Sequence, residues 1–115
     1  MTCSTTGNVL SLPFSQYPQL QQSGGSVAVQ AQGYSDPNCG QSDIIVFKDS
    51  SGQYVALSAG CNHACCPAGF NGSDIRCPCH GASWDLTGKL TRGPASANLA
   101  NLTVCSDSTG VYVSF

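Results

Sequence analysis

Apolar and polar residues alternate along six short stretches of the chain, and turn-forming residues separate these stretches. The six stretches are residues 8–14, 26–32, 43–49, 54–59, 100–104 and 111–115. Alternation with a period of two is typical of β-strands that bury one face. Between the stretches, Gly, Ser, Asp, Asn and Pro cluster at 23–25, 35–40, 50–53 and 106–110, where they predict turns. The pattern predicts an all-β fold, built as an antiparallel β-sandwich or barrel.

Helical patterns are nearly absent, since only residues 17–24 have the composition of a single helical turn. Residues 60–88 interrupt the alternation, because Cys, His, Gly, Pro and Asn replace β-branched residues there. A chain of 115 residues supports one domain, here 1–115. Within it we expect a base subdomain formed by 1–59 and 89–115. Residues 60–88 are expected to form a small loop-rich subdomain at one end of the sandwich.

The low charge of the chain excludes one class of partner. Charged residues make up 9% of the chain and the formal net charge is -2, so the basic surface of a nucleic-acid-binding protein is missing. No apolar run approaches the roughly 18 residues of a membrane span, and the N-terminus lacks the features of a signal peptide. We therefore expect membrane attachment only through an anchor outside this sequence. The neutral polar composition favours a protein that works outside the cytosol.

Cysteine and histidine are concentrated in two segments, CNHACC at 61–66 and CPCHGASWD at 77–85. Together they hold five of the eight cysteines and both histidines. Each segment places one Cys close before one His, which indicates a metal centre with two thiol and two imidazole ligands. A disulfide scaffold alone leaves the histidines unexplained. A structural zinc site is the other alternative, but its first ligand pair is usually spaced by two to four residues, whereas one residue intervenes here.

The arrangement C-x-H followed by C-x-x-H resembles the ligand motif of the Rieske iron-sulfur family, from 23–30 through to 110–115. The resemblance implies the Rieske fold and a 2Fe-2S cluster with Cys61, His63, Cys77 and His80 as ligands. In such a cluster two thiolates hold one iron and two imidazoles hold the other. Because neutral imidazoles replace thiolates, reduction potentials of this class run from about -150 to +300 mV.

The resemblance is closest to Rieske proteins of quinol-oxidising complexes, which carry C-x-H-x-x-C together with C-P-C-H-G. In those proteins the non-ligand cysteines of the two loops form a disulfide across the cluster. The corresponding pair here is Cys66 and Cys79, and it implies an exported protein.

Four cysteines then remain and allow three pairings. They are Cys3, Cys39, Cys65 and Cys105. A hairpin between 43–49 and 54–59 would bring Cys39 near the first ligand loop, which favours a Cys39–Cys65 disulfide. Cys3 would then pair with Cys105. Free thiols are the competing interpretation of these four residues.

The sequence departs from the family pattern beside the second ligand loop. Quinol-oxidising members usually carry Ser after C-P-C-H-G and Tyr two residues later, and the hydroxyls of both bond to sulfur atoms of the site. This chain has Ala82 and Trp84 there, so we expect a potential well below the top of the family range. An inward turn of Ser83 would restore part of the loss. Gly93 and Pro94 resemble the start of the proline loop that covers one side of the cluster in the family.

These features predict a one-electron transfer protein, because a cluster with four protein ligands exchanges electrons but has no open position for a substrate. His63 and His80 would couple electron transfer to proton transfer through their second ring nitrogens. The expected partner is a redox protein or a quinol. Alternatives are the Rieske head of a membrane quinol-oxidising cytochrome complex, an oxidoreductase subunit, or a structural zinc or disulfide binding module. We expect a monomer located in the periplasm or on the outer face of a membrane.

Overall fold

The computed structural model describes residues 3, 7–22, 25–31, 33–34, 43–49, 51–58, 69–70, 74–77, 81–93 and 99–115. These residues form antiparallel β-strands and one short 3-10 helix. The elements are β1 (Val9–Pro13), η1 (Pro18–Gln21), β2 (Ser26–Gln30), β3 (Asp43–Lys48), β4 (Tyr54–Ser58), β5 (Gly69–Phe70), β6 (Ile75–Arg76), β7 (Ser83–Trp84), β8 (Leu90–Arg92), β9 (Asn101–Ser106) and β10 (Gly110–Ser114). The fold is nearly all-β, as predicted.

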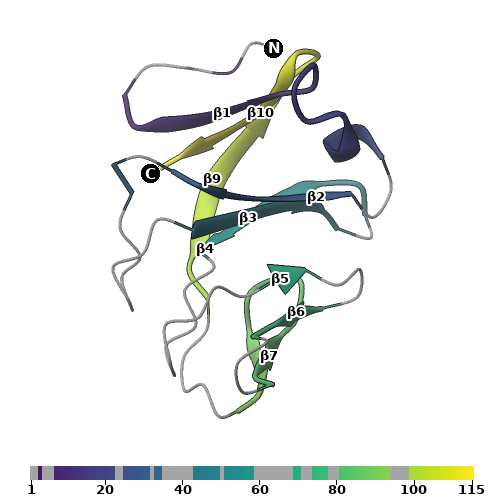
Figure 1. Ribbon diagram of the computed structural model, residues 1–115, viewed down its shortest axis with the longest axis vertical. Helices are drawn as coiled ribbons and strands as arrows, with labels where there is room; N and C mark the ends of the chain where they lie inside the picture. Colours follow the sequence, from purple (N-terminus) through teal and green to yellow (C-terminus); the bar gives the residue numbers. More distant parts are fainter. Residues whose placement is uncertain are drawn as a thin grey trace.

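The strands form two sheets (Figure 1). The larger sheet has six strands in the order β1-β10-β9-β4-β3-β2 and curls into a half-barrel. The smaller sheet has four strands in the order β5-β6-β7-β8 and lies beneath β3 and β4 in the view of Figure 1. None of the described residues belongs to a helix long and apolar enough to cross a membrane.

The six strands that the alternating pattern predicts are all present in the large sheet. Their ends differ from the predicted ends by one or two residues, as in β9, which continues to Ser106. The predicted hairpin between β3 and β4 is confirmed by pairs from Lys48↔Tyr54 to Ile44↔Ser58. The single predicted helical turn is η1. The turn between β3 and β4 therefore sets their register, and it places the end of β4 beside the start of β3.

β3 is buried on both faces, which explains why the alternation that predicts this strand gives way to the apolar run IIVF at 44–47. Ile44 and Val46 point into the interior of the half-barrel. Ile45 and Phe47 point the other way, toward the small sheet. A strand covered on both sides has no solvent face, so its sequence loses the alternation of a half-buried strand.

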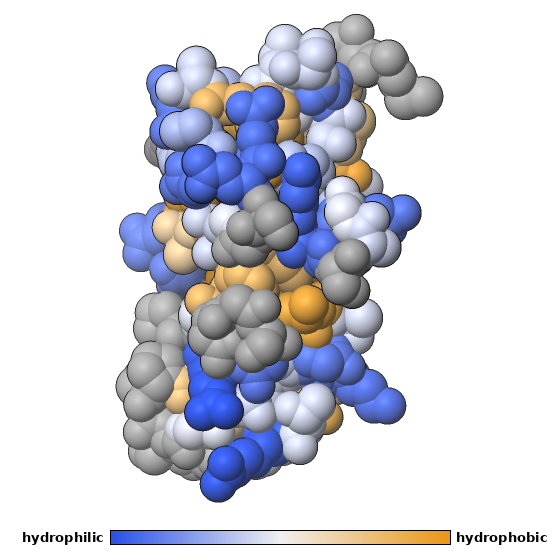
Figure 2. Space-filling view, turned by 90° about the vertical axis from the view of Figure 1, so that its right-hand side faces the viewer, coloured by the Kyte–Doolittle hydropathy of each residue, from blue (hydrophilic) through white to orange (hydrophobic). Residues whose placement is uncertain are grey.

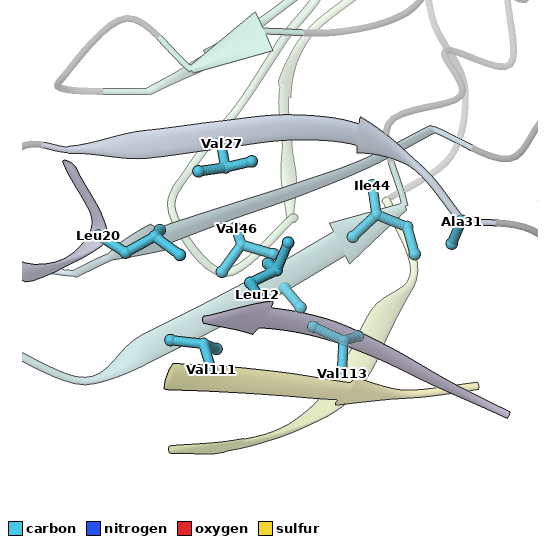
Figure 3. Packing of buried hydrophobic residues seen from close by; sticks show 9 residues of the cluster. Leu12, Leu20, Val27, Ala31, Ile44, Val46, Val111 and Val113 are labelled. Carbon is cyan, nitrogen blue, oxygen red and sulfur yellow. The ribbon is translucent and has the colours of Figure 1, made fainter. Parts of the chain in front are cut away.

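The interior of the half-barrel is one continuous apolar core, which we call the inner core (Figure 3). Its buried members are Leu12, Leu20, Val27, Ala31, Ile44, Val46, Ala56, Val111 and Val113. Leu20 comes from η1 and is fully buried, because the helix packs against β2 and β3. The Tyr54 hydroxyl donates a 2.7 Å hydrogen bond to the Leu20 carbonyl and so fixes η1 to β4.

A second apolar core, the joint core, lies between the two sheets. Its buried members are Ile45, Phe47, Leu57, Ile75, Cys77, Ala82, Trp84 and Leu99. The ring of Phe47 stacks on that of Phe70 from β5, with centroids 4.7 Å apart and planes inclined by 7°. Apolar contact thus joins the small sheet to the large one.

Three turns share one sequence pattern, D-x-[S/T]-G, at 49–52, 85–88 and 107–110. In each turn one carboxylate oxygen accepts the backbone N–H of the residue two positions on, at 2.9, 2.9 and 2.8 Å. The same oxygen accepts the hydroxyl of that residue at 2.7, 2.6 and 2.6 Å. The carboxylates thus satisfy backbone N–H groups that have no backbone carbonyl as a partner in a tight turn.

The turn carboxylates should make stability depend on acid. The Thr109 hydroxyl, helped by backbone N–H groups, lowers the pKa of Asp107 from 3.8 to about 2. A carboxylate with a lowered pKa stabilises the fold above its unfolded pKa, and the effect is lost as the pH falls through the folded pKa. Asp107→Asn should therefore destabilise the protein most at neutral pH and not at all near pH 2, as urea unfolding across pH would show. A penalty that is the same at both pH values would contradict this.

A disulfide joins Cys3 to Cys105 in β9. The backbone N–H of Cys3 also donates to a carboxylate oxygen of Asp107 at 3.2 Å. The predicted pairing of these two cysteines is confirmed, and the free-thiol interpretation is wrong for them. Cys39 and Cys65 lie outside the described residues.

Candidate metal centre

The second predicted ligand loop, 77–82, is closed by backbone hydrogen bonds at its base. Cys77 directly follows β6, and Ala82 directly precedes β7. The N–H of Cys77 donates to the Ala82 carbonyl at 2.8 Å, and the N–H of Gly81 donates to the Cys77 carbonyl at 3.0 Å. The β6–β7 hairpin therefore continues up to Cys77 and holds its side chain at the start of the loop.

Cys77 has the environment of a thiolate ligand. It is a free cysteine with 1% of its surface exposed, and it belongs to the joint core together with Ile75, Ala82 and Trp84. A metal ligand of this kind requires a thiol that is not consumed in a disulfide, and an apolar surrounding that excludes water. The donor type and the burial of Cys77 fit the predicted cluster.

Several predicted site residues lie outside the described residues. These are Cys61, His63, Cys66, Cys79, His80 and Pro94. Among the residues that the structure describes, no group of three metal-binding side chains occurs. The complete ligand set and the Cys66–Cys79 disulfide therefore remain predictions from the sequence motif.

The residues beside the ligand loop lie on two opposite faces of β7. Ala82 and Trp84 are fully buried and point into the joint core. Ser83 lies between them in the strand, and its hydroxyl shares a 3.0 Å hydrogen bond with the Thr91 hydroxyl of β8. Because side chains alternate across a strand, an inward turn of Ser83 would have to break its hydrogen bond with Thr91, and this turn stays a prediction.

The turn at 85–88 docks on the large sheet at the point where the chain returns from the small one. The Gly88 carbonyl accepts the N–H of Leu99 at 2.8 Å. One residue beyond Ala100, the side-chain amide of Asn101 donates to the Thr87 carbonyl at 2.7 Å. Leu99 is 3% exposed and packs in the joint core beside Cys77 and Trp84. The two ends of segment 93–99 are thus tied to the hairpin that carries Trp84.

Gly88 tests this docking, with Gly52 as the matched control. Both have a positive φ, +86° and +85°, but a Cβ on Gly88 would lie 2.8 Å from the Leu99 carbonyl oxygen, whereas one on Gly52 meets nothing within 4 Å. Gly52→Ala should cost about 1–2 kcal/mol, the left-handed backbone penalty alone. Gly88→Ala should cost roughly 1–3 kcal/mol more, because the contact with Leu99 must also give way. Urea unfolding measures both, and equal penalties would argue against close docking.

A surface groove of about 390 Å³ lies in the large sheet, where β4 and β9 separate. It is lined by Gly52, Gln53, Tyr54, Val104 and Ser106. None of these residues belongs to the predicted site, so the groove has no place in the metal chemistry.

The comparisons with known proteins point to a single family of iron-sulfur proteins. The family model described as Rieske [2Fe-2S] domain matches residues 20–103. The cytochrome b6-f complex iron-sulfur subunit of Synechococcus sp. (strain CC9605) is 38% identical over 73 residues, covering 62% of this chain and 40% of that protein. Subunit 1 of the same kind from the cyanelle of Cyanophora paradoxa is 42% identical over 59 residues, covering 50% of this chain and 25% of that protein. The chain thus spans two fifths or less of the length of these relatives.

Solved structures support the fold. The plasma membrane Rieske protein PetC3 from Synechocystis PCC 6803 superposes with a TM-score of 0.72 at 22% identity, covering 92% of this chain and 99% of that one. The ferredoxin of carbazole 1,9a-dioxygenase from Nocardioides aromaticivorans IC177 gives 0.67 at 23% identity, covering 94% and 98%. The cofactor that this family holds is a Rieske-type 2Fe-2S cluster. Since the family model covers most of the sequence, including both ligand loops, the chain belongs to the Rieske [2Fe-2S] domain family.

Proposed function

We propose that this protein is a one-electron carrier whose cluster is held by Cys61, His63, Cys77 and His80. The observation that carries the proposal is Cys77, a buried free thiol at the base of a closed C-P-C-H-G loop in a chain of the Rieske family. When bound, the cluster accepts and returns a single electron. Four protein ligands leave no position for a substrate, so the protein passes electrons between partners.

The chain's own residues would hold the cluster and keep it dry. The hydrogen bonds between Cys77 and Ala82 and between Gly81 and Cys77 fix the second loop. Trp84 and Leu99 cover the thiol side within the joint core. His63 and His80 would bind through one ring nitrogen and carry a proton on the other, which couples electron transfer to pH. The first loop, 60–68, would supply the other ligand pair.

We assign the disulfides Cys66–Cys79 and Cys39–Cys65 to the same proposal. The Cys3–Cys105 disulfide supports it, because disulfides persist in oxidising compartments and an exported protein meets that condition. The proposed division is a single domain with a base at 1–59 and 89–115 and a cluster-binding part at 60–88. The last strand of the small sheet, β8, follows shortly after the cluster-binding part. We expect the exported protein to be a monomer in the periplasm or on the outer face of a membrane.

The test is the cofactor content of Cys77→Ala. We expect the unmodified protein to be brown, to contain iron and acid-labile sulfide in equal amounts, and to show the paramagnetic resonance of a reduced Rieske cluster. Cys77→Ala should lose all three, whereas Ser83→Ala, which removes one side-chain heteroatom from the same hairpin and leaves the thiol, should keep them. A colourless protein that binds one zinc ion would contradict the proposal.

A second candidate is the Rieske head of a quinol-oxidising cytochrome complex. It is favoured by the relatives that are cytochrome b6-f complex subunits, two fifths of whose length this chain matches. Reduction by a water-soluble quinol separates the two candidates. Rapid reduction that depends on quinol concentration would favour the head, and reduction only by a protein partner would favour the carrier.

A further inference from the structure

The few charges of the chain are divided unevenly between its two halves. Three of the four basic residues, Arg76, Lys89 and Arg92, lie in segment 60–98 with two carboxylates, Asp74 and Asp85, so this segment has a formal charge of +1. The rest of the chain has one basic residue, Lys48, and four aspartates, a formal charge of -3. The half that contains the small sheet is therefore the positive end of an electric dipole.

Two of the basic residues lie in one row across the small sheet. Arg76 of β6 pairs with Ser83 of β7, and Ser83 pairs with Arg92 of β8. Directly paired residues of antiparallel strands point to the same face, and Ile75 and Trp84 point into the joint core, so Arg76 and Ser83 share the opposite face. The pairing of β7 with β8 shifts register at this point, so it places Arg92 on the neighbouring strand, about two strand spacings or roughly 10 Å from Arg76, without fixing its face.

The basic side chains of this half are accessible. The side chain of Arg76 is 61% exposed, and Lys89 and Arg92 are also exposed. Arg76 lies 3.7 Å from a carboxylate oxygen of Asp74, a loose pair at the surface. Figure 2 shows strongly hydrophilic side chains on the lower part of the molecule, where the small sheet lies, and also on its upper part. We call these three exposed basic residues of the small-sheet half, Arg76, Lys89 and Arg92, the basic face; Lys89 also interacts with the carboxylate of Asp85.

The basic face lies on the sheet that ends at the proposed ligand loop, with Arg76 and Cys77 on opposite faces. Cys77 is the next residue after Arg76, but its side chain is buried in the joint core, so only the backbone layer of the small sheet separates the two. At the other end of the dipole, Asp49 and Asp107 close turns of the large sheet, where hydroxyl and N–H groups stabilise their charged form. A partner of negative charge would therefore be drawn to the end that bears Cys77.

We propose that the basic face is the docking surface for an acidic redox protein. The inference rests on the proposed function, since it takes Cys77 as a cluster ligand. Only 9% of the residues are charged, so a small number of side chains determines the field around the molecule. Complementary charges raise the rate of encounter and orient the partners, and salt weakens both effects. Docking at this face would bring the partner to the half of the molecule that contains Cys77.

A gold electrode coated with a carboxylate-terminated monolayer serves as the acidic surface. Protein with its cluster should exchange electrons with it at low ionic strength. Arg92→Gln should lower the interfacial rate about threefold and Arg76→Gln/Arg92→Gln about tenfold, and roughly 0.3 M salt should remove the differences. Lys48→Gln is the matched control, because it removes the same charge from β3 in the other half, where Lys48 Nζ lies 5.3 Å from the Tyr54 ring centroid. It should leave the rate nearly unchanged.

Two results would overturn the docking surface. One is an equal loss of rate in Lys48→Gln and Arg92→Gln, which would mean that net charge alone matters. The other is faster exchange on an amine-terminated monolayer than on the carboxylate one. The visible spectrum of the same samples separates this failure from failure of the proposed function. An intact cluster without charge dependence overturns only the docking surface, whereas a protein without a cluster overturns the proposed function.

Discussion

Ala82→Ser should raise the reduction potential of the cluster by up to about 65–130 mV. The added hydroxyl would lie beside the ligand loop, because the Ala82 carbonyl accepts the Cys77 N–H and its side chain is fully buried in the joint core. A hydrogen bond to a charged group is worth about 1.5–3 kcal/mol, and about 1.4 kcal/mol corresponds to 59 mV for one electron. The reduced cluster carries more negative charge, so it gains more from the donor. Protein-film voltammetry measures the change.

Ser83→Ala is the control for this prediction. It also changes one hydroxyl in β7, but that hydroxyl is bonded to Thr91 on the outer face of the strand. The potential should therefore stay where it is. If Ser83→Ala lowered the potential by as much as Ala82→Ser raises it, the serine hydroxyl would have to face the cluster after all.

Trp84→Tyr should raise the potential in the same direction, with a cost in stability. Trp84 is fully buried in the joint core, so the smaller ring leaves a void that destabilises the fold by roughly 1–3 kcal/mol. Trp84→Phe creates nearly the same void without a hydroxyl. A potential that rises in Trp84→Tyr and not in Trp84→Phe would identify the hydroxyl, rather than repacking, as the cause.

The strands of the large sheet can be predicted from the sequence because each has five or six residues, enough to show an alternating pattern. The small sheet cannot be predicted in this way. β5, β6 and β7 have two residues each and β8 has three, so no period can be recognised. Their pairing depends on tertiary contacts such as the stacking of Phe70 on Phe47 and the burial of Trp84. The turn at 85–88 does have a sequence signal, because its pattern D-x-[S/T]-G also occurs at 49–52 and 107–110, where turns are predicted.

The candidate site, too, could be predicted from the sequence only in part. The spacing of Cys and His indicates the ligands, because coordination chemistry demands particular residue types close together, and the free, buried Cys77 fits that assignment. The orientation of Ser83 could not be predicted, since its partner Thr91 is reached only through the irregular pairing of β7 with β8. The docking of Asn101 on Thr87 likewise joins residues 14 positions apart across two sheets.

Removing the Cys3–Cys105 disulfide should produce the largest loss of stability among these variants. The two cysteines are 102 residues apart, so the bond closes nearly the whole chain into a loop. In the chain-entropy model a loop of about 100 residues stabilises the fold by about 4.7 kcal/mol, because the cross-link restricts the unfolded chain. Cys3→Ala/Cys105→Ala should therefore lower the free energy of unfolding by about 4–5 kcal/mol. Replacing both cysteines avoids a new free thiol that could exchange with other disulfides.

Urea unfolding of the double variant measures this loss, and Asp107→Ala separates it from the local contact. Asp107 accepts the Cys3 N–H, so its replacement weakens the attachment of the N-terminal segment while the covalent bond remains. It also removes the carboxylate from the turn that joins β9 to β10, an effect on the folded state alone. If the disulfide acts by restricting the unfolded chain, its removal should also steepen the dependence of stability on urea, because a chain without the cross-link exposes more surface. A loss below about 1 kcal/mol with an unchanged slope would show that the unfolded chain keeps its ends close together without the bond.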